Sequence, residues 1–379
     1  MIRIEDKRDC CGCAACMQVC PKCCIEMHED IEGFLYPQIN IERCIGCGKC
    51  EKVCPELNLG FPHKPLVVYA AKNKNEEIRY KSSSGGIFTL LAEQLIDEGG
   101  IVFGARFNDD WEVIHDFAET KEELSAFRGS KYVQSKIGDI YKQIEHFLKE
   151  DRKVMFTGTP CQITGLKRFL QKEYDKLLTV DFVCHGVPSP KVWRHYLHET
   201  VEDSQIHEID FRSKKEGWRN YFFSLSFSKD GGRKVFSYTS VFYENIYMKA
   251  FLADLILRPS CYTCPFKSGV SGSDMTIGDF WGIESVLPLI DDNKGCSLVL
   301  LNNEKSLVYY SKLDACTVMV SYEDAVRGNP SFENPANEHP NRKRFFKLLD
   351  KNSCLDTLIV QNMKYSFFYR VKQYIRKNS

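Results

Sequence analysis

Residues 10–21 read CCGCAACMQVCP, and residues 44–55 read CIGCGKCEKVCP. Each run holds three cysteines separated by two residues, and a fourth that follows after three residues and precedes a proline. In this spacing three thiolates surround one cubane iron–sulfur cluster, and the fourth reaches the cluster of the other run. We therefore predict two [4Fe-4S] clusters with crossed ligand sets: Cys10, Cys13, Cys16 and Cys54 for the first, and Cys44, Cys47, Cys50 and Cys20 for the second.

Two other structures produce cysteine-dense segments of this length, a disulfide knot and a pair of zinc ribbons. Zinc needs only paired Cys-x2-Cys ligands, so the third cysteine and the Cys-Pro ending favour iron–sulfur clusters. The first eight residues, MIRIEDKR, carry no signal-peptide pattern, and we expect a cytoplasmic protein with reduced cysteines. Cys11, Cys23 and Cys24 are expected to pack near the clusters, although Cys11 could compete with Cys10 for iron.

Length and charge restrict the function of the remainder. The chain has 379 residues, far more than two clusters need, so another unit must use the electrons. Its 51 basic and 51 acidic residues balance, which argues against a nucleic-acid partner. No apolar run approaches the ~18 residues of a transmembrane helix, so contact with a membrane would be peripheral at most. Residues 364–377 carry only positive charges among aromatic residues, which is typical of a helix on anionic lipid or of a docking helix with a solvated face.

The order of apolar runs and breakers predicts a multidomain α+β protein. A two-cluster ferredoxin-type domain spans residues 1–60 and ends in a linker rich in proline and glycine. Residues 66–148 and 150–330 form an α/β part with a partly parallel sheet. Residues 336–379 form a helical tail.

Two strand–loop–helix units follow one another in the α/β part. Residues 153–157 and 177–183 are short apolar strands, and the loops after them carry Cys161 and Cys184. Strands joined by a helical crossover are normally parallel neighbours, so both loops should lie at the same carboxyl edge of the sheet. A later Cys-x2-Cys pair completes a set of four. We predict a third [4Fe-4S] cluster, with zinc or unliganded thiols as alternatives, on Cys161, Cys184, Cys261 and Cys264. The isolated cysteines are expected in the core: Cys296, Cys316 and Cys354.

A serine- and glycine-rich segment, SSSGG at residues 82–86, precedes an apolar pattern of helical spacing that ends at Gly99. Free amides and the helix dipole at such a start attract an anion. The same pattern also fits an ordinary N-cap with a flexible approach.

Six short motifs are spread over nearly the whole chain: SSGG at 83–86, GSKYVQS at 129–135, GTPCQ at 158–162, CHG at 184–186, the cysteine pair at 261 and 264, and GDFWG at 278–282. In this order and spacing they resemble the beta subunits of coenzyme F420 hydrogenases and dehydrogenases. That family also includes the plant hydroxymethyl-chlorophyll reductase and a divinyl-chlorophyllide reductase.

The resemblance implies an FAD-dependent redox domain in which the flavin lies beside a cubane cluster, held by cysteines that match the third set. Residues 66–148 would be the FAD-binding part of the family, and residues 150–330 its C-terminal part. The FAD diphosphate would lie on the amides of the helix after Gly86. The residues implied in FAD binding are Ser83, Ser84, Gly85, Gly86, Ser130, Lys131, Tyr132, Gly158, Thr159 and Pro160.

Two side chains are candidates for the chemistry of this domain. Lys131 could place positive charge near the pyrimidine end of reduced flavin, or could be a surface lysine. His185 could deliver a proton to a substrate, or could hydrogen-bond a cluster sulfur, which we favour. Family members in methanogens use the deazaflavin coenzyme F420, whereas the fused ferredoxin-type domain resembles bacterial relatives whose substrate the motifs do not fix. NAD(P) lacks its usual Gly-x-Gly-x2-Gly cradle.

Two functions fit these features. In the first, the chain is an iron–sulfur flavoprotein oxidoreductase that passes electrons from reduced ferredoxin, or a similar low-potential carrier, through its clusters to FAD and on to a small-molecule acceptor. In the second, it is a non-catalytic electron-transfer subunit that serves a partner redox subunit in a larger complex.

Overall fold

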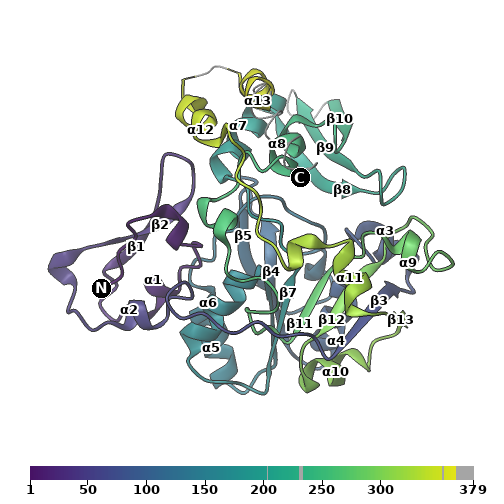
Figure 1. Ribbon diagram of the computed structural model, residues 1–379, viewed down its shortest axis with the longest axis horizontal. Coiled ribbons are helices and arrows are strands. Elements are labelled where there is room, and N and C mark those ends of the chain that lie inside the picture. Colours follow the sequence, from purple (N-terminus) through teal and green to yellow (C-terminus); the bar gives the residue numbers. More distant parts are fainter. Residues whose placement is uncertain (203, 230–233, 352–353, 364–379) are drawn as a thin grey trace, which may run out of the picture.

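The computed structural model describes residues 1–202, 204–229, 234–351 and 354–363. Three parts are visible in Figure 1: a small N-terminal unit at the left, a large mixed sheet with its helices in the centre, and a smaller sheet with the C-terminal helices at the top. This arrangement confirms the predicted multidomain α+β class with a partly parallel sheet.

The N-terminal unit contains one two-stranded antiparallel sheet, made of β1 (Ile25–Glu29) and β2 (Leu35–Ile39). Each cysteine run folds into a loop followed by one short helix, α1 (Ala15–Val19) in the first run and α2 (Lys49–Lys52) in the second. Two 3-10 turns complete the unit: η1 (Lys7–Asp9) and η2 (Ile41–Arg43).

The central sheet has eight strands in the order β13-β3-β12-β11-β7-β6-β4-β5. The four strands β11, β7, β6 and β4 are parallel, and the other pairs are antiparallel. Their bounds are β3 (Val67–Asn73), β4 (Ile101–Phe107), β5 (Val113–Ala118), β6 (Val154–Gly158), β7 (Leu177–Phe182), β11 (Met275–Asp279), β12 (Ser297–Leu301) and β13 (Ala315–Met319).

Helices cover both faces of this sheet because alternate strand residues point to opposite sides. Phe103 and Phe156 pack with α5 (Ile140–Lys149) and α6 (Pro160–Leu170), together with Cys11 and Cys13 from the N-terminal unit. Val102 and Met155, their neighbours along the strands, pack on the other face against α4 (Ile87–Asp97). The remaining short helices of this part are α3 (Glu76–Lys81), η3 (Glu123–Ala126), η4 (Pro259–Thr263), α9 (Ile283–Val286), α10 (Glu304–Tyr310), α11 (Tyr322–Arg327) and η5 (Pro330–Phe332).

The crossover predicted from the sequence is present. Strands β6 and β7 are joined through α6 and pair in parallel, with Gly158 opposite Asp181. Helix α6 begins at Pro160 because Thr159 is its N-cap. Both loops therefore leave the sheet at one edge.

The upper part surrounds an aromatic core that includes Trp193, Phe211, Tyr247 and Phe345. Its elements are α7 (Pro190–Val201), β8 (Gln205–Ser213), β9 (Phe222–Lys229), β10 (Lys234–Val241), α8 (Ile246–Leu252), α12 (Arg342–Leu349) and α13 (Leu355–Met363). Helices α12 and α13 agree with the predicted helical tail, whereas its basic aromatic stretch at 364–377 lies outside the described residues. None of the helices in the described ranges combines the length and hydropathy that crossing a bilayer requires.

Candidate iron–sulfur centres and cofactor cavity

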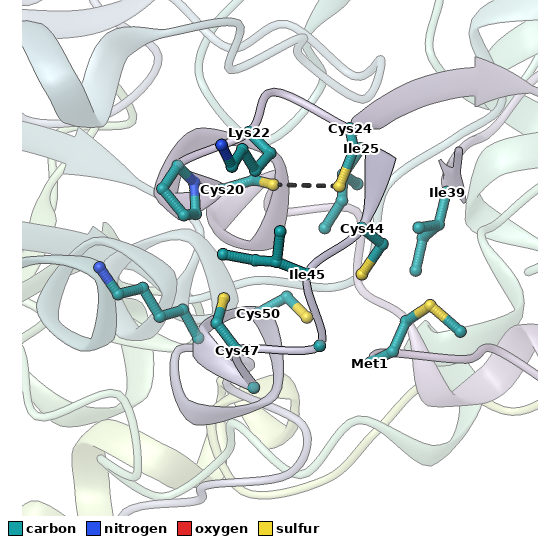
Figure 2. Close-up of a pocket in the computed structure, with 14 residues that line it drawn as sticks. Met1, Cys20, Lys22, Cys24, Ile25, Ile39, Cys44, Ile45, Cys47 and Cys50 are labelled. Carbon is teal, nitrogen blue, oxygen red and sulfur yellow. Dashed lines mark hydrogen bonds between the residues drawn. The ribbon is translucent and has the colours of Figure 1, made fainter. Parts of the chain in front are cut away.

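The second predicted set of cysteines lines one small pocket at the outer end of the N-terminal unit. Figure 2 shows Cys20 entering this pocket from the first run, while Cys44, Cys47 and Cys50 enter it from the second. The structure therefore brings the crossed set together. Cys24 is a fifth thiol of the pocket, and its Sγ lies 3.4 Å from Sγ of Cys20.

The first predicted set lies on the inner side of the same unit, against the main body. Burial, together with the nearby thiols of Cys10 and Cys54, raises the pKa of Cys16 to about 12. Cys13 packs on helix α6, where a Cβ at Gly165 would come within 3.1 Å of the cysteine Sγ. Only glycine leaves room for this close approach.

Arg258 fastens the first set to the main body, although no local sequence pattern indicates this role. The side chain is fully buried. Its guanidinium donates from Nε to the carbonyl of Cys10 at 2.7 Å and from Nη2 to the carbonyl of Leu35 at 2.9 Å. Nη2 also lies 3.6 Å from Sγ of Cys10, and the cation stands 4.3 Å from the centre of the Tyr36 ring. A buried positive charge thus faces a predicted cluster ligand.

The third predicted set converges at the carboxyl edge of the central sheet. Cys161 stands in the first turn of α6, Cys184 in the loop after β7, and the last two cysteines in and just after η4. Burial raises the pKa of Cys184 to about 12; Lys267 opposes this shift, whereas the neighbouring thiols of Cys161 and Cys264 add to it. Burial also raises the pKa of Cys261, with Cys184 as the next largest cause of a rise. Cys161 and Cys264, which are 103 positions apart along the chain, are therefore neighbours here.

The donor chemistry of these sets fits iron–sulfur clusters. In the first and third sets, buried thiols whose pKa values are raised become stable thiolates only beside a strong positive charge, which a metal centre supplies. Among the described residues, no three His, Cys, Asp or Glu side chains are arranged to hold a single metal ion. A cubane cluster requires its four thiolate ligands to be further apart, because each cysteine binds a different iron.

The remaining cysteines differ in their surroundings. Cys11 is buried, and its thiol interacts with Cys13 of the first set and Cys161 of the third. Cys24 and Cys296 are also buried. The prediction that Cys316 lies in the core is wrong: the residue is exposed, because β13 is the outermost strand of the sheet. Cys354 is half-buried, and Cys23 is exposed.

A cavity of about 620 Å³ adjoins the third set, since Cys184 is part of its lining. This volume is within the usual range for cofactor sites. Most of the residues implied in FAD binding line it: Ser83, Ser84, Gly86, Ser130, Lys131, Tyr132, Gly158 and Thr159. Gly85 and Pro160 lie outside the lining. The Gly85 amide donates to Ser297 Oγ at 3.0 Å, and a Cβ there would lie 2.3 Å from the carbonyl of Ala71, so this residue is pressed against the sheet.

Hydrogen bonds to neighbouring segments fix the position of the serine loop in the cavity wall. Ser83 Oγ accepts from the Ser130 amide at 2.6 Å, which joins two of the implied FAD loops. Lys214 donates from Nζ to the carbonyl of Ser84 at 2.6 Å. Gly86 is the N-cap of α4, and no side chain caps the first turn. The start of α4 can therefore offer amides to an anion.

Lys131 is half-buried in the cavity wall and is therefore not a surface lysine. Its Nζ donates to the carbonyl of Arg128 at 3.0 Å and to that of Gly129 at 3.2 Å. Burial lowers the pKa of this lysine to about 7, against a smaller opposing effect of Asp210. Its charge is consequently sensitive to a bound anion.

Two further polar residues of the cavity lining were missed by sequence reasoning. Arg212 is buried, pairs with Asp279 at 2.9 Å and lies 4.0 Å from the centre of the Tyr221 ring. His115 is buried, and its Nε2 lies 3.0 Å from the carbonyl of Thr157. Burial lowers its pKa to about 4, so the imidazole is neutral. Within the described part of the chain, Arg212 Nε and His115 Nδ1 have no hydrogen-bond partner, as expected of a polar ligand site.

His185 lies in the cavity lining but faces no sulfur. Its Nε2 lies 2.6 Å from Oδ1 of Asp254, and its Nδ1 lies 3.4 Å from Oγ of Ser331. Both ring nitrogens therefore have oxygen partners, contrary to the favoured interpretation of a hydrogen bond to a cluster ligand.

Clustered thiols beside a large cavity indicate an iron–sulfur electron-transfer protein. Comparison with family models then gives the particular family. Residues 68–142 match the N-terminal part, and residues 151–320 the C-terminal part, of "Coenzyme F420 hydrogenase/dehydrogenase, beta subunit"; residues 36–59 match "4Fe-4S binding domain". The chain belongs to the coenzyme F420 hydrogenase/dehydrogenase beta-subunit family, with a 4Fe-4S ferredoxin-type domain at its N-terminal end.

Among solved structures, a chain of the F420-reducing [NiFe] hydrogenase complex from Methanosarcina barkeri is similar at 18% sequence identity, over 80% of this chain and 91% of that chain, with a TM-score of 0.45. At this score the likeness adds nothing to the family assignment. A search of curated proteins found no match.

Proposed function

We propose that the chain is an iron–sulfur flavoprotein oxidoreductase that transfers electrons between a low-potential carrier and a small organic substrate. In this proposal three [4Fe-4S] clusters are bound by the three cysteine sets, and FAD is bound in the cavity. The function requires reduced cysteines, for which the cytoplasm is the expected location.

The observation that carries this proposal is the continuity of the sites. Cys11 interacts with Cys13 of the first set and Cys161 of the third, and Cys184 of the third set also lines the cavity. Short gaps between centres are what a chain of electron-transfer sites needs. FAD, when bound, exchanges single electrons with a cluster and electron pairs with a substrate.

The residues of this chain would bind and orient the cofactor. The first turn of α4 and the neighbouring Ser83 would hold the diphosphate, since no side chain caps the α4 amides and the Ser83 hydroxyl, which accepts from the amide and hydroxyl of Ser130, can still donate. The unpartnered Arg212 Nε offers a donor and the unpartnered His115 Nδ1 an acceptor to the polar edges of the ring system. Lys131 would add positive charge where reduced flavin becomes negative.

The second candidate is a non-catalytic electron-transfer subunit of a larger hydrogenase or dehydrogenase complex. The family description, which names a beta subunit, favours it. In that case the catalytic centre lies in a partner redox subunit, and coenzyme F420 becomes one candidate acceptor among several.

A reoxidation experiment separates the two candidates. The purified chain is reduced with dithionite under anaerobic conditions, and small acceptors, including coenzyme F420, are screened for reoxidation of its flavin. Turnover with a small acceptor supports the oxidoreductase. Recovery only after addition of a protein partner would count against it and favour the electron-transfer role.

A further inference from the structure

The outer end of the N-terminal unit is open to solvent, whereas its inner end is covered. Cys47 is exposed and Ile45 beside it is 61% exposed. Cys13, Cys16 and Cys54 at the inner end are all buried. In Figure 1 the segment between β2 and α2 forms the tip that projects furthest from the main body. The second cysteine pocket is therefore the part of the unit that another molecule can approach.

Basic side chains surround this tip. Lys22 and Lys49 line the cysteine pocket, as Figure 2 shows for Lys22. Arg43 donates from Nη2 to the carbonyl of Lys22 at 3.2 Å, which places it next to the pocket, and Lys52 follows in α2. Over the described ranges, none of these four side chains forms an ion pair, so their charges are available to a partner.

The carboxylates near the tip do not cancel this charge. Glu51 is engaged by the N-terminal ammonium group of Met1 at 2.7 Å. Glu42 is the one other carboxylate in the segment from residue 40 to residue 53. The balance of the surface around the pocket is therefore positive.

Two acidic residues of the unit pair with arginines of the main body. Glu32 pairs with the buried Arg342 at 2.6 Å, and Glu29 pairs with Arg194; both arginines belong to the main body. These two carboxylates are engaged by the main body, whereas the four basic side chains of the tip form no ion pair with it among the described residues.

We propose that this basic tip, defined by Lys22, Arg43, Lys49 and Lys52 around Ile45, is the docking surface for an acidic electron-carrier protein. The proposal rests on the proposed function, because it names the partner of the electron-entry site. A small apolar centre with a charged rim is typical of brief redox encounters, in which complementary charge raises the association rate. A carrier seated on Ile45 and Cys47 would lie directly over the most exposed cysteine set.

Binding measurements on the full-length holoprotein test the surface. The probe is an acidic bacterial two-cluster ferredoxin, and its dissociation constant is measured at low and at physiological salt. The double variant Lys22→Glu with Lys49→Glu should weaken binding about tenfold or more at low salt and flatten its salt dependence. Lys142→Glu with Lys343→Glu is the matched control, since both lysines are exposed and the change in net charge is the same.

The controls distinguish a failure of the docking surface from a failure of the proposed function. Iron content and circular dichroism must match the parent protein, as expected for surface lysines. Photoreduction by neutral deazariboflavin should reduce the flavin equally in all variants; no flavin reduction in any of them would overturn the proposed function but not the docking surface. Equal losses of ferredoxin binding in the tip variant and the control variant, or none in either, would overturn the docking surface.

Discussion

The first and second cysteine sets have the same spacing but different surroundings. The first set lies between the N-terminal unit and helix α6, with Cys13 against Gly165 and the guanidinium of Arg258 on Cys10. The second set lies in an open pocket with Lys22 and Lys49 at its rim. The repeat in the sequence thus specifies two similar ligand loops, whereas the main body makes one an inner site and the other an outer site.

This difference places the three cysteine sets in order, from the outer end of the N-terminal unit to the main body. The outer site is accessible to a carrier, and the inner site contacts the third set through Cys11. A substitution beside one site should therefore alter that site and leave the other sites unaltered.

The largest effect is expected at the third set. Cys161→Ser should remove one cluster, about four irons, and leave the two ferredoxin-type clusters in place. The reason is that serine does not replace a thiolate ligand well in a site whose other three members come from distant segments. Iron analysis and low-temperature EPR of the reduced protein measure the loss. An unchanged iron count would mean that Cys161 is not a ligand.

Arg258→Gln should distinguish the inner site from the outer site. The guanidinium favours the more negative, reduced state of the first cluster, so its removal should lower that reduction potential by about 60 mV, a tenfold change for one electron. The second cluster should keep its potential, and Arg258→Lys should show a smaller shift. An EPR-monitored redox titration measures both clusters together. Equal shifts at the two clusters would contradict the assigned positions.

Lys131 should make flavin binding depend on pH. Burial lowers the pKa of the free lysine to about 7, whereas an anionic cofactor favours its ammonium form. Affinity should therefore be constant below pH 7 and fall above it, by at most about tenfold per pH unit. Fluorescence quenching of FAD from pH 6 to pH 9 measures this. Lys131→Met should abolish the dependence, and the exposed Lys142→Met should retain it. The same pH profile in the Lys131 variant would exclude this role.

The smallest effect is expected at Cys316. The residue is exposed on the edge strand β13 and distant in sequence from all three sets. Cys316→Ser should leave the iron content unchanged and alter the free energy of unfolding by less than about 0.5 kcal/mol. Loss of iron in this variant would show that the cysteine sets have been assigned incorrectly.

The sequence predicted those features that depend on local spacing or on handedness. The convergence of Cys161 with Cys184 was predicted because a strand–helix–strand unit is almost always a parallel pair. The start of α4 was predicted from its glycines. Both rules can be applied to one continuous stretch of sequence, without knowledge of contacts to distant segments.

Features that depend on distant partners were not predicted. Arg258 and Cys10 are 248 positions apart, and nothing in either local sequence indicates the contact. Arg212 and Asp279 also meet only through the fold, although Asp279 belongs to a motif that was noted. Cys316 was misplaced because the outermost position of β13 depends on strand order. Gly85 was placed in the FAD site, whereas its amide is engaged by Ser297.

Central to the proposed function is a third cluster, held beside the flavin cavity by four cysteines scattered over the α/β part. Its most direct test is a count of iron, acid-labile sulfide and flavin per chain in the anaerobically purified protein. We predict about twelve irons, about twelve sulfides and one FAD. About eight irons with a full complement of flavin would contradict the third cluster.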